Sequence, residues 1–104
     1  PPTCILYPDD LASIGGLNAI KEAGYRIPED ISIAGYDGIQ LSQYLAPKLT
    51  TWKQDTEKIG CKAAKELISL IESPKTTGIR QVIVGGCVQE GGTVRQLTDG
   101  ETGL

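Results

Sequence analysis

The sequence contains no histidine, methionine or phenylalanine, and aromatic residues make up only 5% of its 104 residues. Without histidine, the usual general base and the organiser of a catalytic triad are missing. Three cysteines, Cys4, Cys61 and Cys87, share no metal-ligand spacing, and no histidine is present to complete a zinc set. We therefore expect no metal and no cofactor, reduced and mostly buried thiols, and no enzymatic activity.

The sequence also lacks a cluster of positive charge and a long apolar run. Its net charge is −3, and the lysines and arginines are scattered, whereas a nucleic-acid binder shows a basic stripe. No apolar run approaches the ~20 residues that span a bilayer. Hydrophobic residues at 39% and charged residues at 22% are typical of one soluble globular domain at most. The start Pro1-Pro2-Thr3, in a chain without methionine, suggests a piece of a longer protein.

Short apolar runs alternate with a helical pattern in the first part of the chain. Residues 3–7 and residues 31–34 are predicted to be buried strands, the second closed by a Gly-Tyr-Asp-Gly turn at residues 35–38. Between the strands, apolar residues from Leu11 to Ile20 recur at near-helical spacing. A strand, a helix and a strand with short links form a βαβ unit, so we expect parallel strands and a right-handed crossover. The fold class predicted is α/β.

Two glycines, Gly15 and Gly16, lower the helix propensity of this first helix by roughly 1 kcal/mol each relative to alanine. One structural reason for their presence would be close approach of the helix to the sheet or to a ligand.

The second part of the chain continues the α/β pattern. In chain order, we expect a loop or short irregular helix at 39–47, an extended segment at 49–54, a helix capped by Asp55 or Thr56 and ended by Ser73-Pro74, two short strands at 81–84 and 87–89, and a disordered tail at 98–104.

Two aspartates follow the predicted strands at the edge where open parallel sheets bind ligands. Asp9 comes shortly after the first strand, and Asp37 lies in the turn after the second. Neighbouring strands lie about 5 Å apart, so the two carboxylates could share a pocket. Carboxylates accept hydrogen bonds from hydroxyl and amine groups, which suits a sugar or another polyhydroxylated or nitrogenous small molecule.

Each candidate residue also has a structural interpretation. Asp10 is interpreted as the helix cap, and Asp9 as either a cap or a ligand contact. Asp37 could instead hydrogen-bond its own backbone, as turn aspartates often do. Trp52 could stack on a sugar ring or anchor two elements against each other.

Three segments together resemble LacI-family transcriptional regulators, and those at residues 24–37 and 47–54 are specific in combination. Residues 24–37 carry Gly, a basic residue, Pro-Glu-Asp-Ile-Ser and then Gly-Tyr-Asp, which is similar to the family signature. Residues 47–54 resemble the family's Pro-x-Leu-Thr-Thr-Ile/Val-x-Gln crossover between lobes. Residues 2–17 resemble the strand that leads into Ala-Asn-Asp and a helix. The resemblance covers about residues 2–94.

The resemblance implies a parallel-sheet lobe like those of type I periplasmic binding proteins, and an incomplete one. Residues 1–97 would be the C-terminal part of the effector-sensing domain, with the helix at about 56–72 belonging to the other lobe. The implied roles are effector binding for Asp37 and Asp9, helix start for Asp10, and hinge or crossover for Thr51, Trp52 and Gln54. Asp9 stands where the family usually has asparagine, and Glu90 falls near a usual arginine, so no role is transferred to Glu90.

The function implied is sensing of a small-molecule effector, chiefly a sugar, by a cytoplasmic homodimeric regulator. DNA would be bound only through an N-terminal domain outside this chain, and no membrane partner is expected. One alternative is the sugar-binding component of an ABC transporter, which shares the fold. A second alternative is an α/β enzyme that uses the pair of aspartates.

Overall fold

The computed structural model describes residues 1–75, 78 and 80–98. The chain forms two compact units, one made of residues 1–53 with the chain from Cys87 onward, and the other of residues 54–86. That the helix at about 56–72 belongs to the other lobe of the complete protein stays a prediction. Among the described helices, none is long and apolar enough to cross a membrane. Apart from Thr98, the predicted tail at 98–104 lies outside the described residues.

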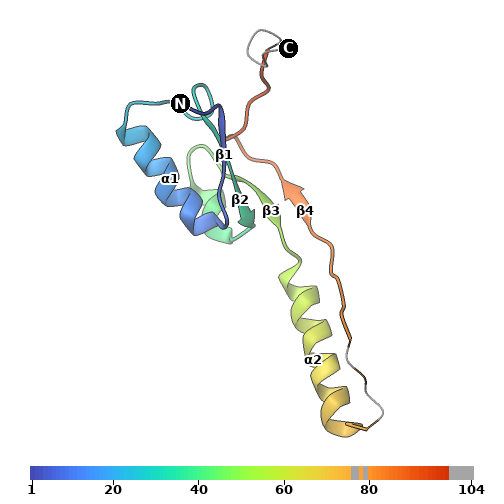
Figure 1. Ribbon diagram of the computed structural model, residues 1–104. Coiled ribbons are helices and arrows are strands. Elements are labelled where there is room, and N and C mark those ends of the chain that lie inside the picture. The colour runs from blue at the N-terminus through green and yellow to red at the C-terminus, as the bar shows by residue number, and fades with distance from the viewer. Residues whose placement is uncertain (76–77, 79, 99–104) are drawn as a thin grey trace. The chain divides into compact units, whose positions relative to one another are not determined.

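The first unit is built on a four-stranded sheet in the order β1-β2-β3-β4 (Figure 1). The strands β1, β2 and β3 are parallel, and β4 runs antiparallel to β3. Their bounds are Cys4–Leu6 for β1, Ser32–Asp37 for β2, Thr50–Lys53 for β3 and Cys87–Gln89 for β4. The predicted α/β class with a parallel-sheet core is therefore confirmed.

The helix α1 (Asp10–Glu22) connects β1 to β2 and packs against one face of the sheet (Figure 1). Its apolar face contributes Leu17 and Ile20 to the core, where they pack with Ile33 of β2 and with Leu49. Ile33 and Leu49 are completely buried. Because strand side chains alternate between faces, these residues define the covered face of the sheet.

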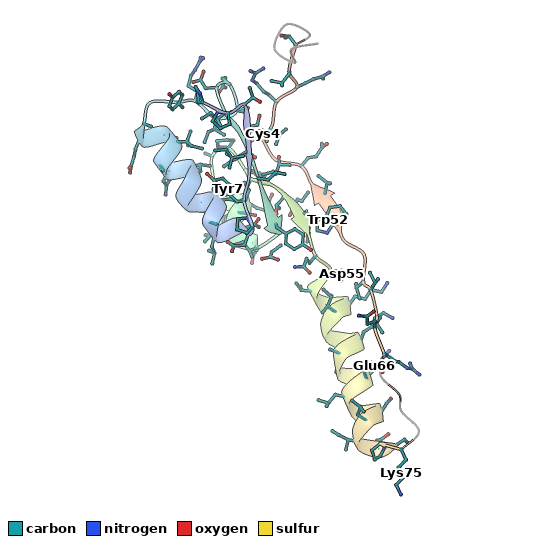
Figure 2. All side chains as sticks on the ribbon, in the orientation of Figure 1. Cys4, Tyr7, Trp52, Asp55, Glu66 and Lys75 are labelled. Atoms are coloured by element: carbon teal, nitrogen blue, oxygen red, sulfur yellow. The ribbon has the colours of Figure 1, made fainter. Side chains whose placement is uncertain are left out.

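The structure gives a reason for one of the two glycines inside α1, Gly16. A β-carbon at Gly16 would collide with the ring and hydroxyl of Tyr7, whereas one at Gly15 would meet nothing within 4 Å. The expected close approach of helix to sheet therefore applies to Gly16, and Tyr7 is the residue it accommodates (Figure 2).

Arg26 and Asp30, on either side of Pro28, are hydrogen-bonded to each other in the turn before β2. The Asp30 carboxylate accepts hydrogen bonds from the Arg26 backbone N–H at 2.7 Å and from its guanidinium at 3.2 Å. These hydrogen bonds, with the guanidinium contributing most, hold the pKa of Asp30 below its usual value. The Arg26–Asp30 pair therefore stabilises the turn that leads into the amino end of β2, and it lies away from the carboxyl edge where ligands are expected.

The strand β2 is longer than the sequence pattern predicts. Residues 35–37 were expected in a turn, but they continue the strand, because Ala34 to Asp37 pair in register with Thr50 to Lys53 of β3. The following segment forms a short 3-10 helix, η1 (Gln40–Tyr44), as one of the two alternatives predicted.

The second unit contains α2 (Thr56–Glu72) and the chain that returns from it. Asp55 is its N-cap, and its carboxylate accepts a hydrogen bond from the Lys58 backbone N–H at 3.0 Å. The return chain is held to α2 by the Arg80–Glu66 ion pair at 3.1 Å. No residue of α2 is buried, so its apolar side is exposed in this unit.

One predicted strand in this unit is wrong. Residues 81–84 belong to no strand, and Ile83 is 95% exposed. An apolar run becomes a strand only when a neighbouring strand accepts its backbone hydrogen bonds. Within the described part of the second unit no strand lies beside residues 81–84.

The prediction of buried cysteines is also wrong. Cys4, Cys61 and Cys87 are all free thiols with exposed side chains. Cys4 lies in β1, and its side chain is on the face of the sheet opposite the covered one. Cys61 lies on α2, in which no residue is buried. Their exposure follows from which faces the described elements cover.

Candidate functional site

Asp37 is the last residue of β2, at the carboxyl edge of the three parallel strands. Its φ is 116°, the only positive φ among the described residues other than glycine. Gly38 follows with φ 74°, and a β-carbon there would clash with the backbone of Lys53. A non-glycine residue with such a φ is strained by about 1–3 kcal/mol and persists only where its surroundings hold it. The structure therefore places a half-buried aspartate with a strained backbone at the edge where the sequence predicts a ligand.

Asp9 is the N-cap of α1. Its carboxylate oxygen Oδ1 accepts a hydrogen bond from the Ala12 backbone N–H at 2.7 Å, and its backbone is extended. The cap predicted at Asp10 is therefore wrong, because the residue with non-helical backbone angles immediately before the helix is Asp9. A ligand contact by Asp9 stays a prediction.

Asp10 is instead a buried residue that sequence reasoning missed. It is 1% exposed, and its two carboxylate oxygens accept hydrogen bonds from Thr51 Oγ1 at 2.6 Å and from the Ile39 backbone N–H at 2.9 Å. Both partners come from segments far away in the sequence, so local pattern could not reveal them. The sequence carries one trace of this packing, the glycine at position 35. The structure shows the reason, because a β-carbon at Gly35 would collide with the Asp10 carboxylate.

The residues expected at the crossover differ in their surroundings. Thr51 is 2% exposed on the covered face of β3, and Trp52, next to it, is 40% exposed on the opposite face (Figure 2). Gln54 is the first residue of the second unit, so the boundary between the units falls directly after β3. Their role as a hinge stays a prediction.

The open face of the sheet carries a row of large side chains. Tyr36, Trp52 and Val88 are paired in register across β2, β3 and β4, and each is at least 40% exposed. The two interpretations of Trp52 therefore remain stacking on a ligand or contact with another element, since Trp52 does not enter the core cluster of the first unit.

Other parts of the first unit do not match the chemistry expected of the site. A surface hollow of about 480 Å³ lies beside the C-terminal end of α1, and it includes Lys21, Tyr25 and Pro47. It is formed by segments that precede β2 and β3, so it belongs to the amino edge of the sheet. Within the described residues, no group of three or more His, Cys, Asp or Glu side chains is placed to hold a metal ion.

With this geometry established, comparison with known proteins decides the family. Residues 1–94 match the family model of the periplasmic binding protein-like domain. The chain belongs to this family. Its resemblance to the effector-binding domain of LacI-family regulators is confirmed by relatives that are repressors of this family.

Three relatives show the likeness. The chain is 46% identical over 76 residues to the probable HTH-type transcriptional repressor ExuR of Bacillus subtilis, covering 73% of this chain and 23% of that protein. It is 31% identical to the LacI family transcriptional regulator from Enterococcus faecium with bound ribose, with a TM-score of 0.84, covering 92% of this chain and 35% of that one. It is also 31% identical to the lac repressor dimer bound to operator and the anti-inducer ONPF, with a TM-score of 0.78, covering 89% and 32%.

The chain spans only about a quarter of the length of the curated repressor it matches and about a third of each structure. All three relatives are transcriptional regulators. None of the three is an enzyme or a transport protein by name.

Proposed function

We propose that this chain supplies part of the sugar-binding site of a transcriptional regulator, with Asp37 contacting hydroxyl groups of the effector. The observation that carries the proposal is that Asp37, whose backbone is strained, lies at the carboxyl edge of the parallel strands. Ligands of open α/β sheets bind at that edge, and strain of this kind is concentrated at ligand sites. The ribose bound in the similar Enterococcus regulator supports a sugar as the ligand class.

In this proposal, binding shifts a population of open and closed arrangements of two lobes. The chain passes between its own two units after Lys53, so Thr51, Trp52 and Gln54 are the residues proposed to act at the crossover. The effector acts by favouring the arrangement to which it binds more tightly. Asp9, although it caps α1, is the second proposed contact because it lies at the same edge.

The proposal extends to the partners of the whole protein. The lac repressor relative is a dimer bound to its operator, which supports a homodimer that contacts DNA through a separate domain. A DNA-binding regulator acts in the cytoplasm. Sensing rather than catalysis is proposed because the relatives are repressors.

The test is a thermal-shift screen of the complete protein against ribose, lactose, other sugars, sugar phosphates and purines, with Asp37→Ala and Asp37→Gly alongside. A binding compound raises the melting temperature of the native state. We expect a sugar to raise it in the wild type and in neither variant. A shift that survives in both variants contradicts the role of Asp37, and the absence of a shift with any compound contradicts effector sensing.

The two variants separate binding from folding. Glycine adopts positive φ freely, whereas alanine retains the strain. Without ligand, the melting temperature of Asp37→Gly should therefore equal or exceed that of Asp37→Ala. If Asp37→Gly is stable and still fails to respond, the lost response reflects the missing carboxylate and not unfolding.

A further inference from the structure

Asp10 joins three elements of the first unit through one buried carboxylate. The residue belongs to the first turn of α1, and its Oδ1 accepts the hydroxyl hydrogen of Thr51 in β3. Its Oδ2 accepts the backbone N–H of Ile39, which lies between β2 and η1. Asp10 is 1% exposed and Thr51 is 2% exposed, so water does not compete for the hydrogen bond between them.

The packing around this carboxylate leaves it little freedom. Gly35 is the register partner of Thr51 on β2, and a β-carbon at Gly35 would collide with Asp10 Oδ1 and lie 2.7 Å from Ser13 Oγ. A buried carboxylate is stable only when it is well hydrogen-bonded. Here the hydroxyl, the amide and the positive end of the α1 dipole provide that compensation.

The same carboxylate also holds the residue that follows the strained end of β2. Asp37 and Gly38 have consecutive positive φ angles, and the next residue, Ile39, donates to Asp10. On the other side of the turn, Asp37 pairs in register with Lys53. The strained conformation of Asp37 is therefore held between β3 and Asp10.

We propose that Asp10 is a positioning residue that holds the end of β2, with Asp37, and β3 as one rigid group. The proposal rests on the proposed function, in which Asp37 contacts a sugar. A displacement of Asp37 on ligand binding would then be transmitted through Ile39 and the Asp10 carboxylate to Thr51. Thr51 lies three residues before Gln54, where the second unit begins. Asp10 itself need not touch the effector.

The decisive experiment is hydrogen exchange at the Ile39 amide in the complete protein without effector, comparing wild type with Thr51→Val. Valine keeps the shape of threonine but removes the donor, so Asp10 Oδ1 is left buried without its partner. The carboxylate should then move and loosen its bond to Ile39. We expect exchange at Ile39 to become about tenfold faster, equivalent to the loss of one hydrogen bond.

Two variants serve as matched controls. Thr51→Ser retains the hydroxyl and should leave exchange at Ile39 close to wild type. Thr93→Val makes the same substitution at a completely buried threonine, whose hydroxyl donates to the Ile33 carbonyl and accepts from the Thr50 N–H. It removes two hydrogen bonds, to Ile33 of β2 and from Thr50 of β3, that involve neither Asp10 nor Ile39, so it should not accelerate exchange at Ile39.

Equal exchange at Ile39 in Thr51→Val and Thr93→Val would overturn the proposal, because the effect would then be general destabilisation. If Thr51→Val does not fold, Asp10→Asn decides the matter by the same criterion, since its amide can accept only at one of the two positions. Ribose binding by calorimetry adds a second readout: Thr51→Val should weaken it about tenfold relative to Thr93→Val. If the wild type does not bind ribose, that arm counts against a ribose effector, while exchange at Ile39 still decides the role of Asp10.

Discussion

At the scale of single residues, two adjacent aspartates divide two tasks between them. Asp9 caps α1, and Asp10 bonds to distant segments. Sequence reasoning found that a cap must lie at this pair, because a helix start requires an acceptor for its free N–H groups. It assigned the cap to the wrong member, because the choice depends on which side chain the rest of the fold buries.

The cap can be tested directly at Asp9. Asp9→Ala should lower the free energy of unfolding by about 1 kcal/mol, because the Ala12 N–H loses its acceptor, whereas Asp9→Asn should retain most of the stability. Urea unfolding followed by circular dichroism measures both. If Asp9→Ala is as stable as Asp9→Asn, the carboxylate does not stabilise the helix.

At the scale of elements, α1 illustrates how periodicity becomes packing. Its apolar residues recur at helical spacing, but only some of them reach the sheet: Leu17 is 4% exposed and Leu11 is 65% exposed. Periodicity therefore predicts the helix, and the position of the sheet selects the buried residues.

This difference predicts unequal effects of one substitution within one helix. Leu17→Ala should reduce the free energy of unfolding by about 2–5 kcal/mol, because it opens a cavity in the core. Leu11→Ala should change it by less than about 0.5 kcal/mol, because its side chain is already in water. Denaturant midpoints of the two variants give the comparison, and similar losses would mean that α1 does not pack as described.

At the scale of the whole molecule, the exposed apolar residues indicate association. Ile71 is 70% exposed on α2, and Leu6 is 79% exposed on the open face of the sheet. Exposed apolar surface on each unit favours contact with another protein surface. We expect the 104-residue chain alone to dimerise or exchange segments at high concentration.

Light scattering tests this expectation. The mass should rise above that of the monomer with concentration, and a pair of charges at Leu67 and Ile71, introduced as Leu67→Lys and Ile71→Lys, should reduce the rise. These residues lie one turn apart on α2 and are both more than half exposed. A monodisperse monomer at high concentration contradicts the prediction.

The sequence by itself determined the local elements and their order. Apolar spacing predicted β1, α1, β3 and α2, since these signals are carried by residues near one another. The order of two motifs predicted the family. Strand ends followed by aspartates also placed Asp37 at the carboxyl edge, because parallel strands share that edge.

Only the tertiary structure decided which residues are buried and which strands have neighbours. Pairing with β3 extends β2 through Asp37, and the lack of a neighbouring strand leaves residues 81–84 outside any described sheet. The cysteines are exposed because the described elements do not cover them. The bonds of Asp10 span 29 and 41 residues of sequence, so they exist only after β2 and β3 have come together around α1.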